Sequence, residues 1–255
     1  MSTTEAGPPA LKTTDLSMSF GGLHVLQGLN LEIQQSETRS IIGPNGAGKT
    51  TLFNILSGAF APTSGSVEVF GQQVAGASPD AFHRLGLSRS FQVTRVFPDL
   101  TVEENIQLAR VASHPRQPGL IRRPRWVRQL SEEAGKLLEG LELAPLARRT
   151  AGTLSHGDQR RLDIALAMAS EPSIILLDEP TAGMARGEAQ ATMGLLQGLL
   201  KGRTIVLVEH DMDLVMSISD RVSMLHHGKL VVTGTPSEVR ANPEVRKAYL
   251  KGDVE

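Results

Sequence analysis

A glycine-rich loop constrains this chain more than any other feature of its sequence. Residues 43–50 read GPNGAGKT and match the pattern G-x-x-x-x-G-K-[ST] at every fixed position. A short apolar run precedes the loop, and residues 50–57 carry apolar side chains at helical spacing. Glycines let backbone N–H groups converge on phosphate oxygens, and the helix that follows points its positive end at the same anion. The sequence therefore predicts a nucleotide-phosphate site between a strand and a helix.

We expect the residues of this loop to divide the work of binding ATP and Mg²⁺. Lys49 should reach the β- and γ-phosphates, and the hydroxyl of Thr50 should bind the metal. The residues assigned to the nucleotide here are Gly43, Pro44, Asn45, Gly46, Ala47, Gly48, Lys49, Thr50 and Thr51. The alternative is a glycine-rich turn that matches by chance, and the flanking strand and helix argue against it.

A second candidate site is a pair of carboxylates that follows an apolar strand. Residues 174–177 are all apolar, and Asp178 and Glu179 come directly after them. Strands buried on both faces have this composition in parallel sheets, which bind ligands at the carboxyl ends of their strands. We expect Asp178 to hold Mg²⁺ through its water shell and Glu179 to orient and polarise the attacking water. Without the phosphate loop, a solvated acidic strand end would be the ordinary interpretation.

The remaining segments predict a parallel α/β core interrupted by helices. Residues 11–42 alternate short apolar runs with polar breaks, which indicates strands. Residues 204–208 form a second fully apolar strand. Between residues 93 and 150 the pattern becomes helical, most clearly at 102–112 and 131–143. We expect the N-terminal strands to form a smaller antiparallel edge and the helices to form an insert.

The overall composition argues against several classes of protein. The formal net charge is −1, whereas a protein that grips nucleic-acid backbones usually carries a basic excess, so no nucleic acid is expected as a partner. The absence of cysteine excludes disulfides, Cys-ligated zinc and thiol catalysis. The first ten residues lack the pattern of a secretory signal, and no apolar run approaches the ~20 residues that span a bilayer. If the protein serves a membrane, we expect it to do so from outside the lipid.

Residues 154–161, which read LSHGDQRR, narrow the class further. Ser155 is a favourable N-cap, and the helix behind it presents free N–H groups. Taken alone, this segment would be an ordinary capped helix. Its place in the order of motifs is what is informative. That order is Phe20, the loop 43–50, Gln92, residues 154–158, Asp178 with Glu179, and His210.

In this order of motifs the chain resembles a complete ATP-binding cassette (ABC) ATPase from about residue 11 to 235. The resemblance implies an α/β fold: a P-loop NTPase (RecA-like) core with an antiparallel β subdomain and a helical subdomain. It assigns residues 11–92 and 159–235 to the core with its β subdomain, residues 93–158 to the helical subdomain, and residues 236–255 to a C-terminal helical tail.

The resemblance also implies roles for single residues. Phe20 stacks on adenine, with a core aromatic as the rival interpretation. Gln92 contacts Mg²⁺ and the attacking water, and His210 contacts the γ-phosphate. Ser155 and Gly157 bind the γ-phosphate held by the opposite subunit, so two chains sandwich two ATP molecules. The catalytic residues are then Glu179, His210 and Gln92, and the metal-binding residues are Thr50, Gln92 and Asp178.

Two departures from the family pattern bear on these roles. The usual signature is Leu-Ser-Gly-Gly-Gln, whereas this chain has His156 at the third place and Asp158 at the fifth. The serine and the second glycine remain, so we expect anion binding to survive. Residues 182–185 lack the aspartate that many members carry, so communication between the two sites should differ from the common pattern.

Finer details resemble one subfamily, the importer ATPases for branched-chain or hydrophobic amino acids, whose members also serve urea or short amides. The residues concerned are the runs RSFQ at 89–92 and EPTAGM at 179–184 and the tail at 242–250. Lipopolysaccharide-export ATPases share much of this pattern, and a soluble cassette ATPase acting on ribosomes or DNA is a further alternative. The Arg-rich residues 116–128 favour a solvated loop over contact with lipid head groups.

An importer of this kind implies several partners. We expect two transmembrane permease subunits, a second ATPase subunit of the same or a different chain, and, indirectly, a solute-binding protein. The expected location is cytoplasmic, peripheral on the inner face of the cell membrane.

Overall fold

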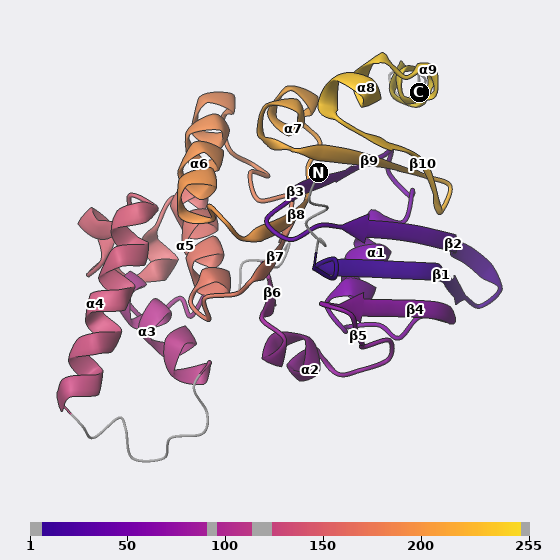
Figure 1. Cartoon of the computed structure of the whole chain (residues 1–255). Coiled ribbons are helices and arrows are strands. Elements are labelled where there is room, and N and C mark those ends of the chain that lie inside the picture. The colour runs from indigo at the N-terminus through magenta and orange to yellow at the C-terminus, as the bar shows by residue number, and fades with distance from the viewer. Residues whose placement is uncertain (1–6, 91–95, 114–123, 251–255) are drawn as a thin grey trace, which may run out of the picture.

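The chain folds around two β-sheets flanked by helices, as the computed structural model in Figure 1 shows. The structure describes residues 7–90, 96–113 and 124–250. Gln92 and most of the Arg-rich segment lie outside the described residues.

The larger sheet has the strand order β10-β9-β3-β8-β7-β6. The strands from β9 to β6 are parallel, and β10 pairs antiparallel with β9 at one edge. Their bounds are Thr38–Ile42 for β3, Leu87–Arg89 for β6, Ile174–Asp178 for β7, Thr204–Val208 for β8, Arg221–His226 for β9 and Lys229–Gly234 for β10. The apolar runs of β7 and β8 are fully buried, which confirms the interpretation of these runs as central parallel strands.

The smaller sheet is antiparallel and has the order β2-β1-β4-β5. Its strands are β1 (Leu11–Phe20), β2 (Leu23–Ile33), β4 (Ser64–Val69) and β5 (Gln72–Gln73). Strands β1 and β2 join through Gly21 and Gly22, whose positive φ angles of 52° and 89° suit a tight turn. The antiparallel edge expected from the sequence is therefore a sheet of its own.

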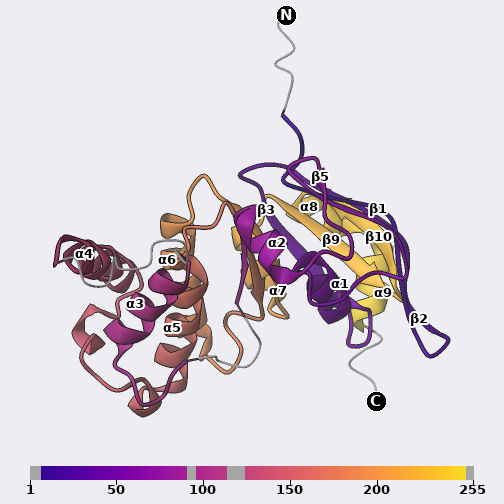
Figure 2. The same cartoon turned by 90° about the horizontal axis from the view of Figure 1, so that it is seen from below.

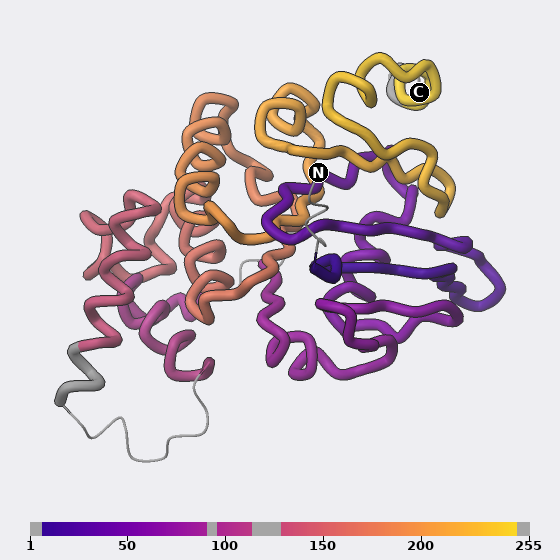
Figure 3. Tube along the Cα trace, in the orientation of Figure 1, coloured from indigo at the N-terminus to yellow at the C-terminus, as the bar shows by residue number. Residues whose placement is uncertain are grey.

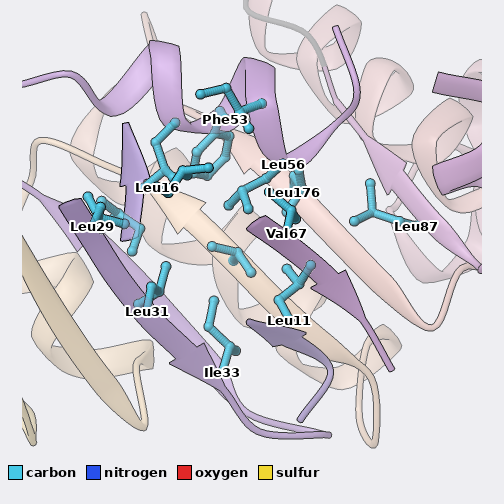
Figure 4. Close-up of a cluster of buried hydrophobic side chains, with 14 of the residues drawn as sticks. Leu11, Leu16, Leu29, Leu31, Ile33, Phe53, Leu56, Val67, Leu87 and Leu176 are labelled. Atoms are coloured by element: carbon cyan, nitrogen blue, oxygen red, sulfur yellow. The ribbon is translucent and has the colours of Figure 1, made fainter. Parts of the chain in front are cut away.

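Helix α1 (Lys49–Leu56) lies between the two sheets (Figure 2). Its buried side chains include Phe53 and Leu56, which pack against Leu16 of the small sheet and Leu176 of the large one (Figure 4). In this first core, α1, the helix that follows the glycine-rich loop, is held by side chains of both sheets.

A second core covers the opposite face of the large sheet. Alternate residues of β7 serve the two cores: Ile174 and Leu176 face the first, and Ile175 and Leu177 the second. The second core is completed by α3 (Val102–Ala112), α4 (Pro124–Gly140), α5 (His156–Met168) and α6 (Arg186–Leu199). Two 3-10 turns, Ala144–Leu146 and Ala151–Thr153, connect α4 to α5, and the short helix α2 (Pro79–Arg84) precedes β6. Figure 3 shows the described parts of α3, α4 and α5 gathered on one side of the molecule.

A third, smaller core joins the C-terminal helices to the sheet. Helices α7 (Met212–Ile218), α8 (Pro236–Ala241) and α9 (Pro243–Leu250) contribute Val215, Val239 and Val245, which pack on β3 and β9. The helical tail expected from the sequence is two helices, because Pro243 cannot continue the hydrogen-bond ladder of α8 and instead begins α9.

Helix α3 has the bounds expected from its periodicity, but α4 begins at Pro124 and not near residue 131. A proline is well suited to the first turn of a helix, where its missing N–H would have no intrahelical partner. Among the helices that the structure describes, none is long and apolar enough to cross a membrane.

Candidate functional site

The glycine-rich loop follows β3 and is held tightly against neighbouring backbone. A Cβ on Gly43, whose φ is +152°, would lie 2.1 Å from the carbonyl oxygen of Leu225 in β9. A Cβ on Gly48, whose φ is +106°, would lie 2.8 Å from the side chain of Leu26 in β2. Both positions therefore require glycine for conformation and for space. The loop is a preformed cradle and not an open turn.

Lys49 begins α1 and is 7% exposed. Its Nζ donates hydrogen bonds to the carbonyl oxygens of Gly43 at 2.5 Å and Pro44 at 3.1 Å. Burial lowers the pKa of Lys49 below its ordinary value, and the nearby charges of Glu179 and Asp178 act in the opposite direction. The loop lysine and the two carboxylates thus share one electrostatic environment, as the sequence predicted.

This environment exists because three strand ends meet at one edge of the sheet. Strand β8 lies between β3 and β7, and all three run parallel, so their carboxyl ends are neighbours. The loop 43–48 follows β3, Glu179 follows β7 and His210 follows β8. The Nε2 of His210 lies 2.7 Å from Oε1 of Glu179, which brings two of the three predicted catalytic residues into direct contact.

Glu179 occupies an unusual backbone position for a residue other than glycine. Its φ is +48°, and its N–H donates to the carbonyl oxygen of Val208 at 2.9 Å. Its side chain is partly buried, whereas the His210 ring is half exposed. Such left-handed backbone costs free energy, and strained positions of this kind cluster at functional sites.

Glu209, which the sequence interpretation missed, holds together the segments that carry Glu179 and His210. Its buried carboxylate accepts hydrogen bonds from the N–H of Thr181 at 3.0 Å and from its hydroxyl at 2.5 Å. The other oxygen accepts from the N–H of His210 at 3.1 Å. Glu209 therefore ties the segment after β7 to the segment after β8. The signal available in the sequence was an acidic residue between the apolar run 204–208 and His210.

The start of α5 carries the predicted Ser155 and Gly157. Ser155 is the N-cap: its Oγ accepts from the N–H of Asp158 at 3.2 Å and donates to the carboxylate of the same residue at 2.7 Å. Arg161 donates to Asp158 at 2.5 Å, so a positive charge offsets the acid that replaces the usual glutamine. The cap is intact despite the departure from the common pattern.

The rest of this signature segment lies against α6 and the chain that precedes it. A Cβ on Gly157 would lie 1.8 Å from Oε1 of Glu188 in α6, so a larger residue there would displace the end of the Glu188 side chain. A Cβ on Gly183 would lie 3.0 Å from the His156 ring, so the ring stands beside this exposed glycine. The histidine at the third signature position thus contacts the segment that follows Glu179 within the same chain.

Phe20 lies at the end of β1 and is 43% exposed, so it is not a core aromatic. Its ring meets that of Phe60 edge to face, with the ring centroids 5.7 Å apart. The exposed ring remains available to a planar ligand.

Asp178 is the predicted metal-binding residue that the structure describes most fully. Its carboxylate is 1% exposed, and Oδ2 accepts a hydrogen bond from Arg89 at 2.8 Å. Within the described residues there is no group of three or more His, Cys, Asp and Glu side chains arranged to hold a metal. One buried carboxylate, a hydroxyl at Thr50 and the phosphates of a nucleotide are the donor set that suits Mg²⁺.

A groove of about 450 Å³ lies beside this site, between β6 and the helices α3 and α5. Arg89 and Asn105 line it, together with Phe97 and Leu108, which are exposed apolar residues. Asn105 holds the start of the α3 segment, because its side chain accepts from the N–H of Phe97 at 2.8 Å and donates to the carbonyl of Thr101 at 2.9 Å. Asn105 therefore joins the segment at Phe97 to α3 on one side of the groove.

The family model described as ABC transporter matches residues 26–182, which is more than half of the chain. The chain belongs to the ABC transporter family. A second model, described as branched-chain amino acid ATP-binding cassette transporter, matches residues 229–250 of this ABC protein.

Two curated relatives match almost the whole length of this ABC protein. The high-affinity branched-chain amino acid transport ATP-binding protein BraF of Pseudomonas aeruginosa is 41% identical over 249 residues, covering 95% of this chain and 98% of the relative. The protein LivG of Escherichia coli, which has the same description, is 42% identical over 252 residues, with the same coverage.

Solved structures agree with the ABC fold. An ATP-binding cassette in its ADP conformation superposes with a TM-score of 0.82 at 28% identity, covering 95% of this chain and 98% of that one. A dimeric cassette bound to ADP and phosphate has a TM-score of 0.76 at 27% identity, covering 89% of this chain and 98% of that one. The chain is thus an ABC ATPase with a nucleotide-binding cassette.

Proposed function

We propose that this chain is the ATP-hydrolysing subunit of an ABC importer that powers uptake of branched-chain amino acids or of related small solutes such as urea and amides. The observation that carries the ATPase part is the meeting of Lys49, Glu179 and His210 at one sheet edge. The cargo class is supported by the descriptions of the relatives BraF and LivG and by the matching C-terminal residues.

In this proposal the residues act on ATP as follows. Phe20 stacks on adenine, and the loop from Gly43 to Thr51 holds the phosphates through its N–H groups and Lys49. Glu179 orients and polarises the attacking water, and its contact with His210 keeps the carboxylate beside the group that touches the γ-phosphate.

Mg²⁺ would be held by Thr50, Asp178 and Gln92, and when bound it neutralises charge on the β- and γ-phosphates. The burial of Asp178 and its place beside Lys49 support this assignment. Gln92 remains a prediction because it lies outside the described residues.

Ser155 and Gly157 would act on the nucleotide of a second ATPase subunit. Both stand at the N-terminal end of α5, where free N–H groups favour an anion. In their own chain these residues contact Asp158 and Glu188. The dimeric structural relative supports the pairing of two cassettes, of the same or different chains.

The remaining partners would be two permease subunits in the membrane, served indirectly by a solute-binding protein, with this chain peripheral on the cytoplasmic face. The groove lined by Phe97 and Leu108 supplies an apolar surface for a permease segment. The boundaries at residues 93 and 158 of a helical subdomain stay a prediction.

Uptake of labelled leucine tests the proposal in cells that lack this chain. Wild-type protein should restore uptake, and Glu179→Gln should not, although it should bind ATP. Purification of the tagged protein from native membranes should then yield multi-span permeases. If the wild-type protein did not raise leucine uptake but still co-purified with permeases, the proposed cargo class would be wrong. The chain would then serve an exporter or an importer of another solute. Ribosomal or DNA-bound proteins without permeases would remove the transport function.

A further inference from the structure

Arg89 at the end of β6 makes contacts that the assigned site does not use. Its Nη2 donates to Oδ2 of Asp178 at 2.8 Å. Its Nη1 donates to Oδ1 of Asn54 at 2.7 Å and to Oγ of Ser57 at 3.0 Å. The guanidinium also lies over the ring of Phe53, 5.8 Å from the ring centroid. One side chain thus bonds three others across two elements that are distant in the sequence.

These contacts connect the two halves of the nucleotide site. Phe53 and Asn54 lie in α1, the helix that begins at Lys49, and Ser57 caps its C-terminal end, whereas Asp178 ends β7. Because the guanidinium is a rigid planar fork, its two ends fix the distance between the helix and the carboxylate. The pair is buried, with Arg89 7% and Asp178 1% exposed, so solvent does not weaken it.

We propose that Arg89 is a positioning residue that fixes the carboxylate of Asp178 against α1, and thereby against Thr50, for binding Mg²⁺ with the nucleotide. The inference rests on the proposed nucleotide site and adds a residue that acts through Asp178. A lysine in its place would carry the charge but could not bond both Asp178 and α1 in the same fixed geometry.

The test compares binding of the ATP analogue AMP-PNP to the full chain in MgCl₂ and in EDTA. The dissociation constant in EDTA divided by the dissociation constant in MgCl₂ measures how much Mg²⁺ strengthens binding. In Arg89→Lys and Arg89→Met this ratio should fall about tenfold, which corresponds to the loss of one charge-assisted hydrogen bond. Binding in EDTA should stay unchanged, because the phosphate loop is intact.

A double variant shows whether Arg89 acts through Asp178. Asp178→Asn should lower the same ratio, and adding Arg89→Met to it should cause no further fall. Additive losses would mean that Arg89 acts independently, and they would overturn the proposal. A ratio in Arg89→Lys equal to or larger than that of the wild type would overturn it too.

Two further variants guard against loss of folding and against a general effect of charge. Asn54→Ala keeps the ion pair and removes one anchor on α1, so a smaller fall is expected, and no fall at all would contradict the proposal. Arg186→Met breaks an exposed pair with Asp213, also an Arg–Asp contact at 2.6 Å, and should leave the ratio unchanged. If the wild type bound no nucleotide, the proposed function itself would fail instead.

Discussion

The charge of Lys49 lies close to the carboxylates of Asp178 and Glu179. The ammonium is buried among loop carbonyls, and the two carboxylates partly offset the cost of that burial. A phosphate group that enters the loop would add negative charge beside the ammonium. The ionisation of Lys49 should therefore respond directly to the nucleotide.

The pH dependence of ATP binding follows from this group. Burial lowers the pKa of Lys49 in the free protein below its ordinary 10.5, and bound phosphate raises it again. Between the two pKa values the complex is protonated and the free protein is not, so binding takes up a proton and weakens as pH rises. Calorimetry in buffers of different ionisation enthalpy measures this uptake. Lys49→Met should abolish it, and an ATP affinity that stays constant with rising alkaline pH would contradict the argument.

Glu209 should matter for turnover more than for binding. In Glu209→Gln the charged acceptor of Thr181 and His210 is lost, so both segments of the catalytic edge loosen. Loss of a hydrogen bond to a charged group costs about 1.5–3 kcal/mol, so we expect the hydrolysis rate to fall about tenfold or more while ATP affinity is kept. Steady-state ATPase assays measure this. Glu244→Gln on the exposed surface of α9 is the control and should be silent.

Among the elements, helix α5 connects the helices of the second core to the end of strand β7. Arg160 in α5 donates to the carbonyl oxygens of Asp178 at 2.5 Å and Glu179 at 2.7 Å. It also pairs with Asp163 one turn further along the helix. Helix α5, which begins with the signature residues, is thereby hydrogen-bonded to the backbone of Asp178 and Glu179.

Breaking this tie should lower stability strongly. Arg160→Met removes the donor to two backbone carbonyls and one partner of a buried acid, so we expect a loss of about 3 kcal/mol in the free energy of unfolding. Urea denaturation measures it. Arg240→Met removes an exposed arginine of α8 that pairs with Asp213, and it should cost less than about 1 kcal/mol. Equal losses of unfolding free energy in the two variants would show that the hydrogen bonds from Arg160 to the backbone carbonyls do not account for the stability.

The elements also show how far the sequence alone could lead. The glycine-rich loop, the buried strands β7 and β8 and helix α3 have strong local patterns, and the structure agrees with each. The predicted start of α4 was wrong because a segment rich in arginine and proline resembles a loop. Helices α2 and α7 were not predicted, because they span only six and seven residues. In α6 the helical spacing of Ala189, Met193 and Leu196 was missed.

Contacts between distant residues could not be predicted in the same way. The pairing of Arg89 with Asp178 depends on β6 lying beside β7, and the strand order is set by packing and not by local sequence. The contact of Glu209 with Thr181 likewise requires β7 and β8 to be neighbours. The predicted site residues were named through their motifs. Glu209 lay outside those motifs, and Arg89 stood in the run RSFQ with no role assigned to it.

At the scale of the whole molecule, the proposed nucleotide site would draw on two chains. Ser155 caps its own helix, His156 lies beside Gly183 in the segment between β7 and α6, and Gly157 lies beside Glu188 in α6. The nucleotide loop and the signature segment therefore stand on different parts of the fold, and a second chain would bring them together.

Assembly should accordingly depend on ATP. Glu179→Gln should bind ATP, hydrolyse it slowly and accumulate as a dimer, because the closed state is no longer resolved by hydrolysis. Size-exclusion chromatography with light scattering measures the mass with ATP and with ADP. Adding Ser155→Arg to this variant should return it to the monomer, with circular dichroism as a check on folding. A Glu179→Gln chain that stays monomeric in ATP would contradict the assembly.

Strand β7 sets a limit on how the chain can vary in length. Its residues alternate between two cores, and its last residue carries the carboxylate of Asp178. Inserting or deleting one residue inside the strand would turn each later side chain to the opposite face, exchanging the contents of both cores at once. The spacing from Ile174 to Glu179 is therefore fixed by packing as well as by chemistry. Changes of length that accumulate over evolution must fall outside this strand, in connections that belong to a single layer.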